Sequence, residues 1–209
     1  MTNSELRAAR GTPSPVTAAL EALHQRFAQA GVSLTTEFDP DWASPCEVGT
    51  PFAADSHWQT DRLVHWRPVP RADQASGLPN DFAGLENALE TELHPDFKAY
   101  FSSYWSGTLE CTASEGHVSL LQLWNPQDID RLIENMIGHV LGQRRARGPL
   151  SLFVACTEAD SDLILSIENA SGAVLLERPG SKPLRTVAAS LGELLDGLAP
   201  SQEPSTSGS

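Results

Sequence analysis

The side chains best suited to acid–base or metal chemistry are scattered along this sequence. Its six histidines are His24, His57, His65, His94, His117 and His139. None is spaced from another His, Cys or Asp as the ligands of a metal site are. Dinucleotide-binding, phosphate-loop, zinc-protease, CxxC, EF-hand and GxSxG motifs are absent as well. The sequence therefore predicts no metal, no cofactor and no catalytic residue, with an enzyme that uses a dispersed acidic site as an alternative.

Carboxylates are the other abundant functional groups. The chain has 27 Asp and Glu residues against 14 Lys and Arg, and its formal net charge is -13. Residues 37–134 hold 17 of the acids and 5 of the bases, an excess of -12. Such a field repels nucleic acid and anionic lipid headgroups and favours a basic partner. The alternative is that the charge serves solubility alone.

Glu86 and Glu90 are the carboxylates that we expect to contact such a partner. A helix predicted to begin near Asp81 places both beside one apolar stripe, formed by Phe82, Leu85, Leu89 and Leu93. Like charges four residues apart repel each other and gain from a shared cation. Asp55, Asp61 and Asp81 belong to the same acidic stretch and are further candidates. The alternative for each residue is a solvated surface position.

Composition indicates a cytoplasmic protein. The three cysteines, Cys46, Cys111 and Cys156, are far apart and odd in number, so no disulfide framework is expected. No apolar run approaches the ~20 residues that span a bilayer. No apolar segment follows the first eleven residues, so no signal peptide is expected.

The elements that must position these residues follow from periodicity. Helices are predicted over 15–30, ending at Gly31, from near 81 to 93, from 95 to 104, over 126–147 and over 188–198. Strands are predicted over 62–66, 107–112, 117–124, 150–157, 163–168 and 173–177. We expect a flexible segment at 1–14, one domain over 15–198, an irregular stretch at 33–60 and a disordered tail at 199–209. The predicted class is α/β of the α+β type, with a mainly antiparallel mixed sheet and flanking helices.

The helix after Asn125, its predicted N-cap, has the clearest pattern. Its apolar stripe consists of Ile129, Leu132, Ile133, Met136, Ile137, Val140 and Leu141. Gly138 inside a helix costs ~1 kcal/mol relative to Ala, and we expect it to pack against another backbone. His139 is expected to take a flank position rather than a catalytic one.

Several ordered segments resemble the Syd family of SecY-interacting proteins. Residues 120–124, Leu-Leu-Gln-Leu-Trp, and residues 134–139, Glu-Asn-Met-Ile-Gly-His, resemble its strand-to-helix signature. Residues 152–155, Leu-Phe-Val-Ala, then Asn169 with Ser-Gly at 171–172, and Ser-Leu at 190–191, continue the similarity in order. Ser-Pro-Cys at 44–46 resembles a family element upstream. The resemblance covers about residues 15–200 and is densest after residue 117.

The resemblance implies a Syd/SUKH-like fold and a binding function. Syd-like proteins attach peripherally to the cytoplasmic side of the inner membrane by docking on cytosolic loops of the SecY translocation channel. They are also soluble in the cytoplasm, and they regulate or check channel assembly through a concave acidic face. Cytosolic loops of membrane proteins are rich in Lys and Arg, which suits an acidic partner. An alternative within the wider superfamily is an immunity protein that neutralises a toxin by binding it.

Overall fold

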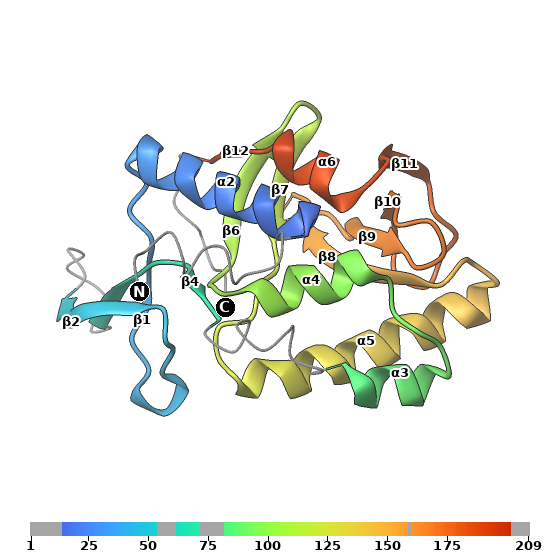
Figure 1. Cartoon of the computed structure of the whole chain (residues 1–209), viewed down its shortest axis with the longest axis horizontal. Helices are drawn as coiled ribbons and strands as arrows, with labels where there is room; N and C mark the ends of the chain where they lie inside the picture. Colours follow the sequence, from blue (N-terminus) through green and yellow to red (C-terminus); the bar gives the residue numbers. More distant parts are fainter. Residues whose placement is uncertain (1–13, 54–61, 72–81, 159, 202–209) are drawn as a thin grey trace, which may run out of the picture.

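The computed structural model of the chain describes residues 14–53, 62–71, 82–158 and 160–201 (Figure 1). The described helices are α2 (Pro15–Ala30), α3 (Ala83–Leu89), α4 (Pro95–Ser103), α5 (Gln127–Ala146) and α6 (Leu191–Asp196), with a 3-10 helix, η1, at Pro40–Trp42. The described strands are β1 (Thr35–Glu37), β2 (Glu47–Ala53), β3 (Arg62–Trp66), β4 (Val69–Pro70), β5 (Tyr104–Trp105), β6 (Leu109–Ala113), β7 (Gly116–Leu120), β8 (Ser151–Cys156), β9 (Ile164–Glu168), β10 (Val174–Glu177), β11 (Arg185–Ala188) and β12 (Ala199–Pro200).

Local sequence sets both ends of α2. The Ser14 hydroxyl accepts the N–H of Thr17 at 3.1 Å, and Pro15 lies in the first turn, where no N–H partner is lost. Gly31 closes the helix in the left-handed conformation, with φ of 66°. The prediction of a helix over 15–30 that ends at Gly31 is confirmed.

A seven-stranded sheet in the order β11-β10-β9-β8-β7-β6-β12 forms the centre of the fold, and its neighbours are antiparallel. The register shifts between Phe153 and Ala155 and between Val174 and Leu175. Bulges of this kind bend strands and increase their twist. β3 pairs with β1 and β2 in a smaller sheet, and β4 pairs with β5. The predicted α+β class is confirmed.

Helices cover both faces of the seven-stranded sheet (Figure 1). α5 contacts β8 on one face, called the outer face here, and α3 packs against α5. α2 contacts α4, α6 and β12 toward the opposite, inner face. The hydrophobic core joins these layers through fully buried side chains, among them Leu20, Leu23, Phe97, Met136 and Leu152.

A buried carboxylate holds α5 on the outer face. Glu177 on β10 is fully buried, and its Oε2 accepts the side-chain N–H of Gln143 on α5 at 2.7 Å. Its Oε1 accepts the Ser151 hydroxyl of β8 at 2.7 Å and lies 3.4 Å from Nε2 of His139 on α5. We call these four side chains the Glu177 cluster. Because a buried charge is costly without such partners, the cluster fixes where α5 lies on the sheet.

Two opposing effects set the pKa of Glu177. Burial alone raises the pKa of a carboxyl group, because desolvation disfavours the charged form. Hydrogen bonds from His139 and Ser151 outweigh burial here and hold the pKa of Glu177 below its ordinary value of 4.5. The side chain therefore stays ionised at neutral pH although it has no contact with solvent.

Two segments that carry the family resemblance contact each other. The Ser44 hydroxyl donates to the carbonyl oxygen of Trp124 at 2.5 Å, and Trp124 Nε1 donates to the carbonyl oxygen of Trp42 at 3.0 Å. The Trp124 ring also meets the Trp66 ring edge-on, with centroids 5.8 Å apart. These contacts join the three-stranded sheet to the start of α5, so both segments position elements of the fold.

Asn169 fastens the turn between β9 and β10 to the connection between α3 and α4. Its Oδ1 accepts the N–H of His94 at 2.8 Å, and its Nδ2 donates to the carbonyl oxygen of Glu92 at 2.9 Å. Gly172 in the same turn has φ of 77°, and a Cβ there would lie 2.6 Å from the His94 ring. Only glycine allows this close approach.

The prediction that residues 33–60 are irregular is wrong for two segments. Thr35–Glu37 and Glu47–Ala53 form β1 and β2, which pair with the two edges of β3. Proline and glycine hide any strand period in this stretch, so pairing with Arg62–Trp66 is what makes the segments strands. Residues 54–60 lie outside the described residues.

The predicted disordered tail begins too early. Ala199 and Pro200 form β12, whose partners on β6 are Thr112 and Cys111. A two-residue strand leaves no periodicity to detect in a sequence. The short strand β11 was missed as well. Residues 1–13 and 202–209 lie outside the described residues, and the single domain over 15–198 stays a prediction.

The helix predicted from near Asp81 to Leu93 is shorter in the structure. α3 ends at Leu89, and Glu90 adopts the left-handed conformation with φ of 54°. The Glu86 carboxylate accepts the N–H of Leu93 at 3.0 Å, so it closes the turn after the helix. Asp81, the predicted start, lies outside the described residues.

The long helix α5 is confirmed with three changes. It begins at Gln127, and Asn125 still accepts the N–H of Asp128 at 3.2 Å. Leu141, assigned to the core stripe, is 43% exposed. Gly138 is exposed, and a Cβ added to it would meet nothing within 4 Å. The prediction that Gly138 packs against another backbone is therefore wrong.

Replacing Gly138 by Ala should stabilise the protein. The added methyl group meets open space, and Ala loses less backbone entropy than Gly in a helix, so Gly138→Ala should raise the free energy of unfolding by about 0.5–1 kcal/mol. Gly172→Ala is the opposing control, because strain and collision with His94 should lower stability by more than ~1 kcal/mol. Urea denaturation of both variants measures the changes, and equal effects would contradict this account.

Gln143→Leu should destabilise the protein by about 2 kcal/mol, because the buried Glu177 carboxylate loses a donor. The same change at Gln127, which is exposed at the start of α5, should have little effect. The ionised Glu177 contributes stability above its ordinary pKa of 4.5, and this contribution is lost as the pH falls through its lowered folded value. The difference between wild type and Gln143→Leu should therefore shrink in acid. An equal loss at Gln127 would contradict the prediction.

Candidate functional site

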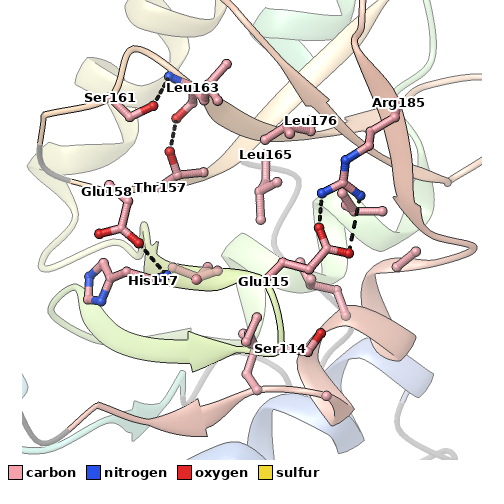
Figure 2. A pocket seen from close by; sticks show the side chains of 18 of the residues that line it. Ser114, Glu115, His117, Thr157, Glu158, Ser161, Leu163, Leu165, Leu176 and Arg185 are labelled. Carbon is pink, nitrogen blue, oxygen red and sulfur yellow. Dashed lines mark hydrogen bonds and ion pairs between the residues drawn. The ribbon is translucent and has the colours of Figure 1, made fainter.

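A cavity of about 480 Å³ opens on the seven-stranded sheet, and we call it the sheet pocket. The β6–β7 hairpin, the connection from β8 to β9, strand β11 and helix α6 contribute its walls (Figure 2). Ligand-binding cavities commonly fall between about 300 and 1,000 Å³, so the volume suits a small ligand or a few side chains of a partner.

The floor of the sheet pocket is apolar and belongs to the inner face. Leu165 on β9 and Leu176 on β10 are cross-strand partners that line it. Their neighbours Ser166 and Glu177 point to the outer face, because successive side chains of a strand alternate between faces. Further apolar lining comes from Val118, Val187, Leu194 and Leu198. The pocket and the Glu177 cluster therefore lie on opposite faces of the same strands.

Three carboxylates line the pocket, Glu115, Glu158 and Glu193. Glu158 is exposed, and its Oε1 accepts the backbone N–H of His117 at 2.8 Å. The Glu193 carboxylate accepts the N–H of Ala189 at 2.7 Å, which ties it to the start of α6. Among the described residues no cation pairs with Glu158 or Glu193. The pocket thus offers carboxylates beside an apolar floor.

An ion pair connects two walls of the pocket. Arg185 at the start of β11 pairs with Glu115 in the β6–β7 turn, and its Nη1 lies 3.5 Å from Glu115 Oε1 (Figure 2). Three strands separate β11 from β7 in the sheet order. The two residues meet because the sheet curls, which makes its inner face concave.

His117 belongs to a second polar network at the hairpin. Its Nε2 lies 2.7 Å from Glu110 Oε2, and the Ser119 hydroxyl donates to the same carboxylate oxygen. Glu110 and Ser119 are cross-strand partners on β6 and β7. The network fixes the imidazole ring against the sheet. Glu158 is not part of it and is the exposed carboxylate on this side of the pocket.

The geometry offers little for nucleophilic catalysis. Burial raises the pKa of Cys46 to about 11 and that of Cys111 to about 12, and it raises the pKa of Cys156 as well, so the three thiols stay protonated. Ser151, His139 and Glu177 have the residue types of a catalytic triad, but Ser151 and Glu177 are fully buried. Ser151 also donates directly to Glu177. The triad-like set is therefore part of the core.

His139 is more enclosed than predicted, since only 5% of its side chain is exposed. Its ring meets the Phe153 ring edge-on, with centroids 5.5 Å apart. In the described ranges, no group of three or more His, Cys, Asp or Glu side chains is arranged to hold a metal ion. The sheet pocket offers a ligand apolar contact and negative charge.

Of the predicted partner-binding carboxylates, the structure describes Glu86 and Glu90, and neither lines the sheet pocket. Glu86 is on α3, and its Oε1 lies 2.9 Å from Lys98 Nζ. The hydrogen bonds from Lys98 and then from the N–H of Leu93 hold the pKa of Glu86 below its ordinary value. Glu90 is exposed just beyond α3, which packs on α5 at the outer face.

The structure describes two of the five predicted residues. Asp55, Asp61 and Asp81 lie outside the described residues. Glu86 and Glu90 flank the end of α3, yet they do not share the helical face that the sequence predicted. Their role in binding a partner stays a prediction.

Sequence reasoning missed the residues of the sheet pocket. The strands predicted over 107–112 and 117–124 place a turn between them, but nothing in the sequence distinguishes Glu115 within that turn. Glu158 follows a predicted strand and carried no further signal. Arg185 lies on a strand that was not predicted. The turn could have drawn attention to residues 114–116, whereas the partner of Glu115 follows only from the curl of the sheet.

The fold and the pocket together define an antiparallel α+β protein with a concave, carboxylate-lined pocket on the sheet. A protein-family model described as Syd protein (SUKH-2) matches residues 17–200. The chain belongs to the Syd family.

Relatives in several bacteria support this assignment. A Protein Syd of Pseudoalteromonas atlantica is 37% identical over 179 residues, which cover 86% of this chain and 89% of the relative. One of Hahella chejuensis is 44% identical over 144 residues, covering 69% of this chain and 71% of the relative. One of Colwellia psychrerythraea is 36% identical and covers 83% and 84%. These names state no catalytic activity, and the absence of enzyme activity stays a prediction.

The helices within the described ranges include none with the length and hydrophobicity needed to span a membrane.

The Glu115–Arg185 ion pair should contribute little to stability. Both side chains are about half exposed, and exposed pairs contribute about 0–1 kcal/mol because water and salt screen them. Arg185→Gln should therefore change the free energy of unfolding by less than ~1 kcal/mol. Arg178→Gln, which removes a similarly exposed pair with Asp162, is the matched control. A loss of several kcal/mol confined to Arg185→Gln would show that the pair holds the sheet in its curled form.

Proposed function

We propose that this chain binds the basic cytosolic loops of the SecY translocation channel through its acidic surface, and so regulates or checks channel assembly. Membership of the Syd family is the observation that carries the proposal, since the residues that resemble the family imply this partner. The chain then associates peripherally with the cytoplasmic side of the inner membrane and is otherwise soluble in the cytoplasm.

The charge of the chain supports a basic partner. The net charge is -13, and the described residues that line the pocket include three carboxylates and one arginine, Arg185. Loops on the cytosolic side of membrane proteins carry an excess of Lys and Arg. The same charge disfavours nucleic acid and anionic lipid, so membrane association depends on the protein partner.

The predicted carboxylates Glu86, Glu90, Asp55, Asp61 and Asp81 belong to this proposal as contacts. Glu86 is the least available of the described pair, because Lys98 already compensates its charge. Glu90 is exposed and has no ion pair among the described residues. A Lys or Arg of the partner should therefore form a more favourable ion pair with Glu90 than with Glu86.

Membrane binding should require the channel and should weaken with salt. Purified chain mixed with inverted inner-membrane vesicles that contain SecY should sediment with them at low ionic strength. It should be released as salt rises, because charge pairs at a surface are screened over ~8 Å at physiological ionic strength. Protein-free vesicles of anionic lipid are the control and should bind nothing. Salt-resistant binding to the lipid control would contradict the proposal.

A double change of Glu86 and Glu90 to Gln should weaken channel binding, mainly at low salt. Glutamine at 86 can still accept the N–H of Leu93, so the fold should persist. Glu134→Gln is a matched control, since Glu134 is an exposed carboxylate on α5. Channel binding that is unchanged at low salt would remove the end of α3 from the proposed interface.

Toxin neutralisation is a second candidate function, because the family model carries the designation SUKH-2. An immunity protein binds a soluble toxin and does not need the channel. Co-purification from cells distinguishes the candidates: a chain retained by SecY-containing membranes supports the first, and a chain found only with a soluble partner supports the second.

A further inference from the structure

The sheet pocket combines an apolar floor with carboxylates at its walls, and these features call for different groups on a ligand. We propose that it binds an extended peptide segment in which a large apolar side chain enters the pocket and a neighbouring Lys or Arg pairs with Glu158. The inference rests on the proposed function, since it names the chemistry by which a basic loop is recognised.

The floor is suited to one large apolar side chain. Leu165 is 4% exposed and Leu176 is half-buried, so the floor is preformed by strands β9 and β10. Leu194 of α6 and Val187 of β11 also line the cavity. A Leu or Phe side chain placed among them leaves water, and fully burying such a side chain is favourable by roughly 1.5–3 kcal/mol.

The charge of the pocket lining favours a Lys or Arg next to the apolar side chain of the peptide. Among the described residues, the lining contains three carboxylates and one arginine, so its formal charge is negative. Arg185 compensates Glu115, and Glu193 is tied to the start of α6. Glu158 and Glu193 are both exposed and have no ion pair among the described residues, but Glu158 is the one that does not close a helix, because it lies on the connection from β8 to β9. The Glu115–Arg185 pair shows that a guanidinium group fits against a carboxylate at this rim.

The edge of the sheet favours an extended ligand. β11 is the edge strand beside the pocket, and within the described residues no strand pairs with its outer side. Arg185 and Val187 of β11 both line the cavity. An extended peptide can pair with such an edge while alternate side chains enter the pocket.

Fluorescence anisotropy with synthetic peptides tests the inference. The probe is a short labelled peptide with a central Leu between two Arg residues, compared with peptides in which Leu is replaced by Ala or both Arg residues by Glu. Wild type should bind the probe, the Ala peptide should bind about tenfold more weakly, and the Glu peptide should not bind measurably.

Protein variants locate the binding. Leu176→Asn should weaken probe binding about tenfold, with Leu184→Asn as the control because Leu184 is 57% exposed and does not line the pocket. Glu158→Gln should weaken it about threefold at low salt and less at high salt, with Glu134→Gln as the control. If Leu176→Asn fails to fold, Ser114→Trp fills the pocket from an exposed turn and should weaken binding likewise.

Several outcomes would overturn the inference. Unchanged probe binding in folded Leu176→Asn and Ser114→Trp would place the peptide elsewhere, and equal binding of the Leu and Ala peptides would show charge attraction alone. Self-association that Leu176→Asn abolishes would assign the pocket to a second copy of the chain.

Channel binding separates this inference from the proposed function. If the pocket variants lose the probe but still bind SecY-containing vesicles, the channel uses another surface and the inference fails while the proposed function stands. If wild type binds the probe through the pocket but not the vesicles, the proposed function fails and the pocket keeps its peptide chemistry.

Discussion

The ionised side chain of Glu177 is fully buried, and the fold must keep every donor that it meets there. Two of these donors come from α5 and one from β8. If the helix shifted along the sheet, the buried carboxylate would lose its donors. Removing one partner of a buried charge is usually more costly than losing an exposed ion pair. The requirement therefore fixes α5 on the outer face, and α3 is positioned in turn because Arg144 of α5 donates to the carbonyl oxygen of Leu89 at 2.7 Å.

The strands that carry the Glu177 cluster on the outer face of the sheet also form the floor of the sheet pocket on its inner face. Leu176 precedes Glu177 along β10, and the pleat of the strand sends one to the pocket and the other to the cluster. Packing α5 against one face leaves the other face for α2 and α6, which contact the edge strands β12 and β11. Bulges curl the sheet, so the β6–β7 turn contacts β11. The sheet pocket is the part of the inner face that the helices leave open. The position of the sheet pocket therefore follows from how the helices and the sheet pack in the core.

Charge along the chain and charge in space are distributed differently. Residues 37–134 carry most of the negative excess, yet Glu158 and Glu193 of the pocket come from the nearly balanced C-terminal part. Glu86, from the acidic stretch, is compensated by Lys98 and closes a turn. Counting charges along a sequence therefore predicts the sign of the partner's charge better than it predicts the residues that contact the partner. Glu177 shows the same limit, because an acid at the end of an apolar strand gave no sign of being buried.

The sequence by itself determined the helices and strands whose signals are local. Caps, turns and periodicity set α2, α5 and the β6–β7 and β8–β9–β10 hairpins, and with them the α+β class. Ordered segments were enough to indicate the family. The tertiary structure alone decided that β1, β2, β11 and β12 are strands, since pairing with distant residues creates them. It also decided the burial of Glu177 and the meeting of Glu115 with Arg185. Each of these depends on contacts between residues that are separated along the chain, which local spacing does not encode.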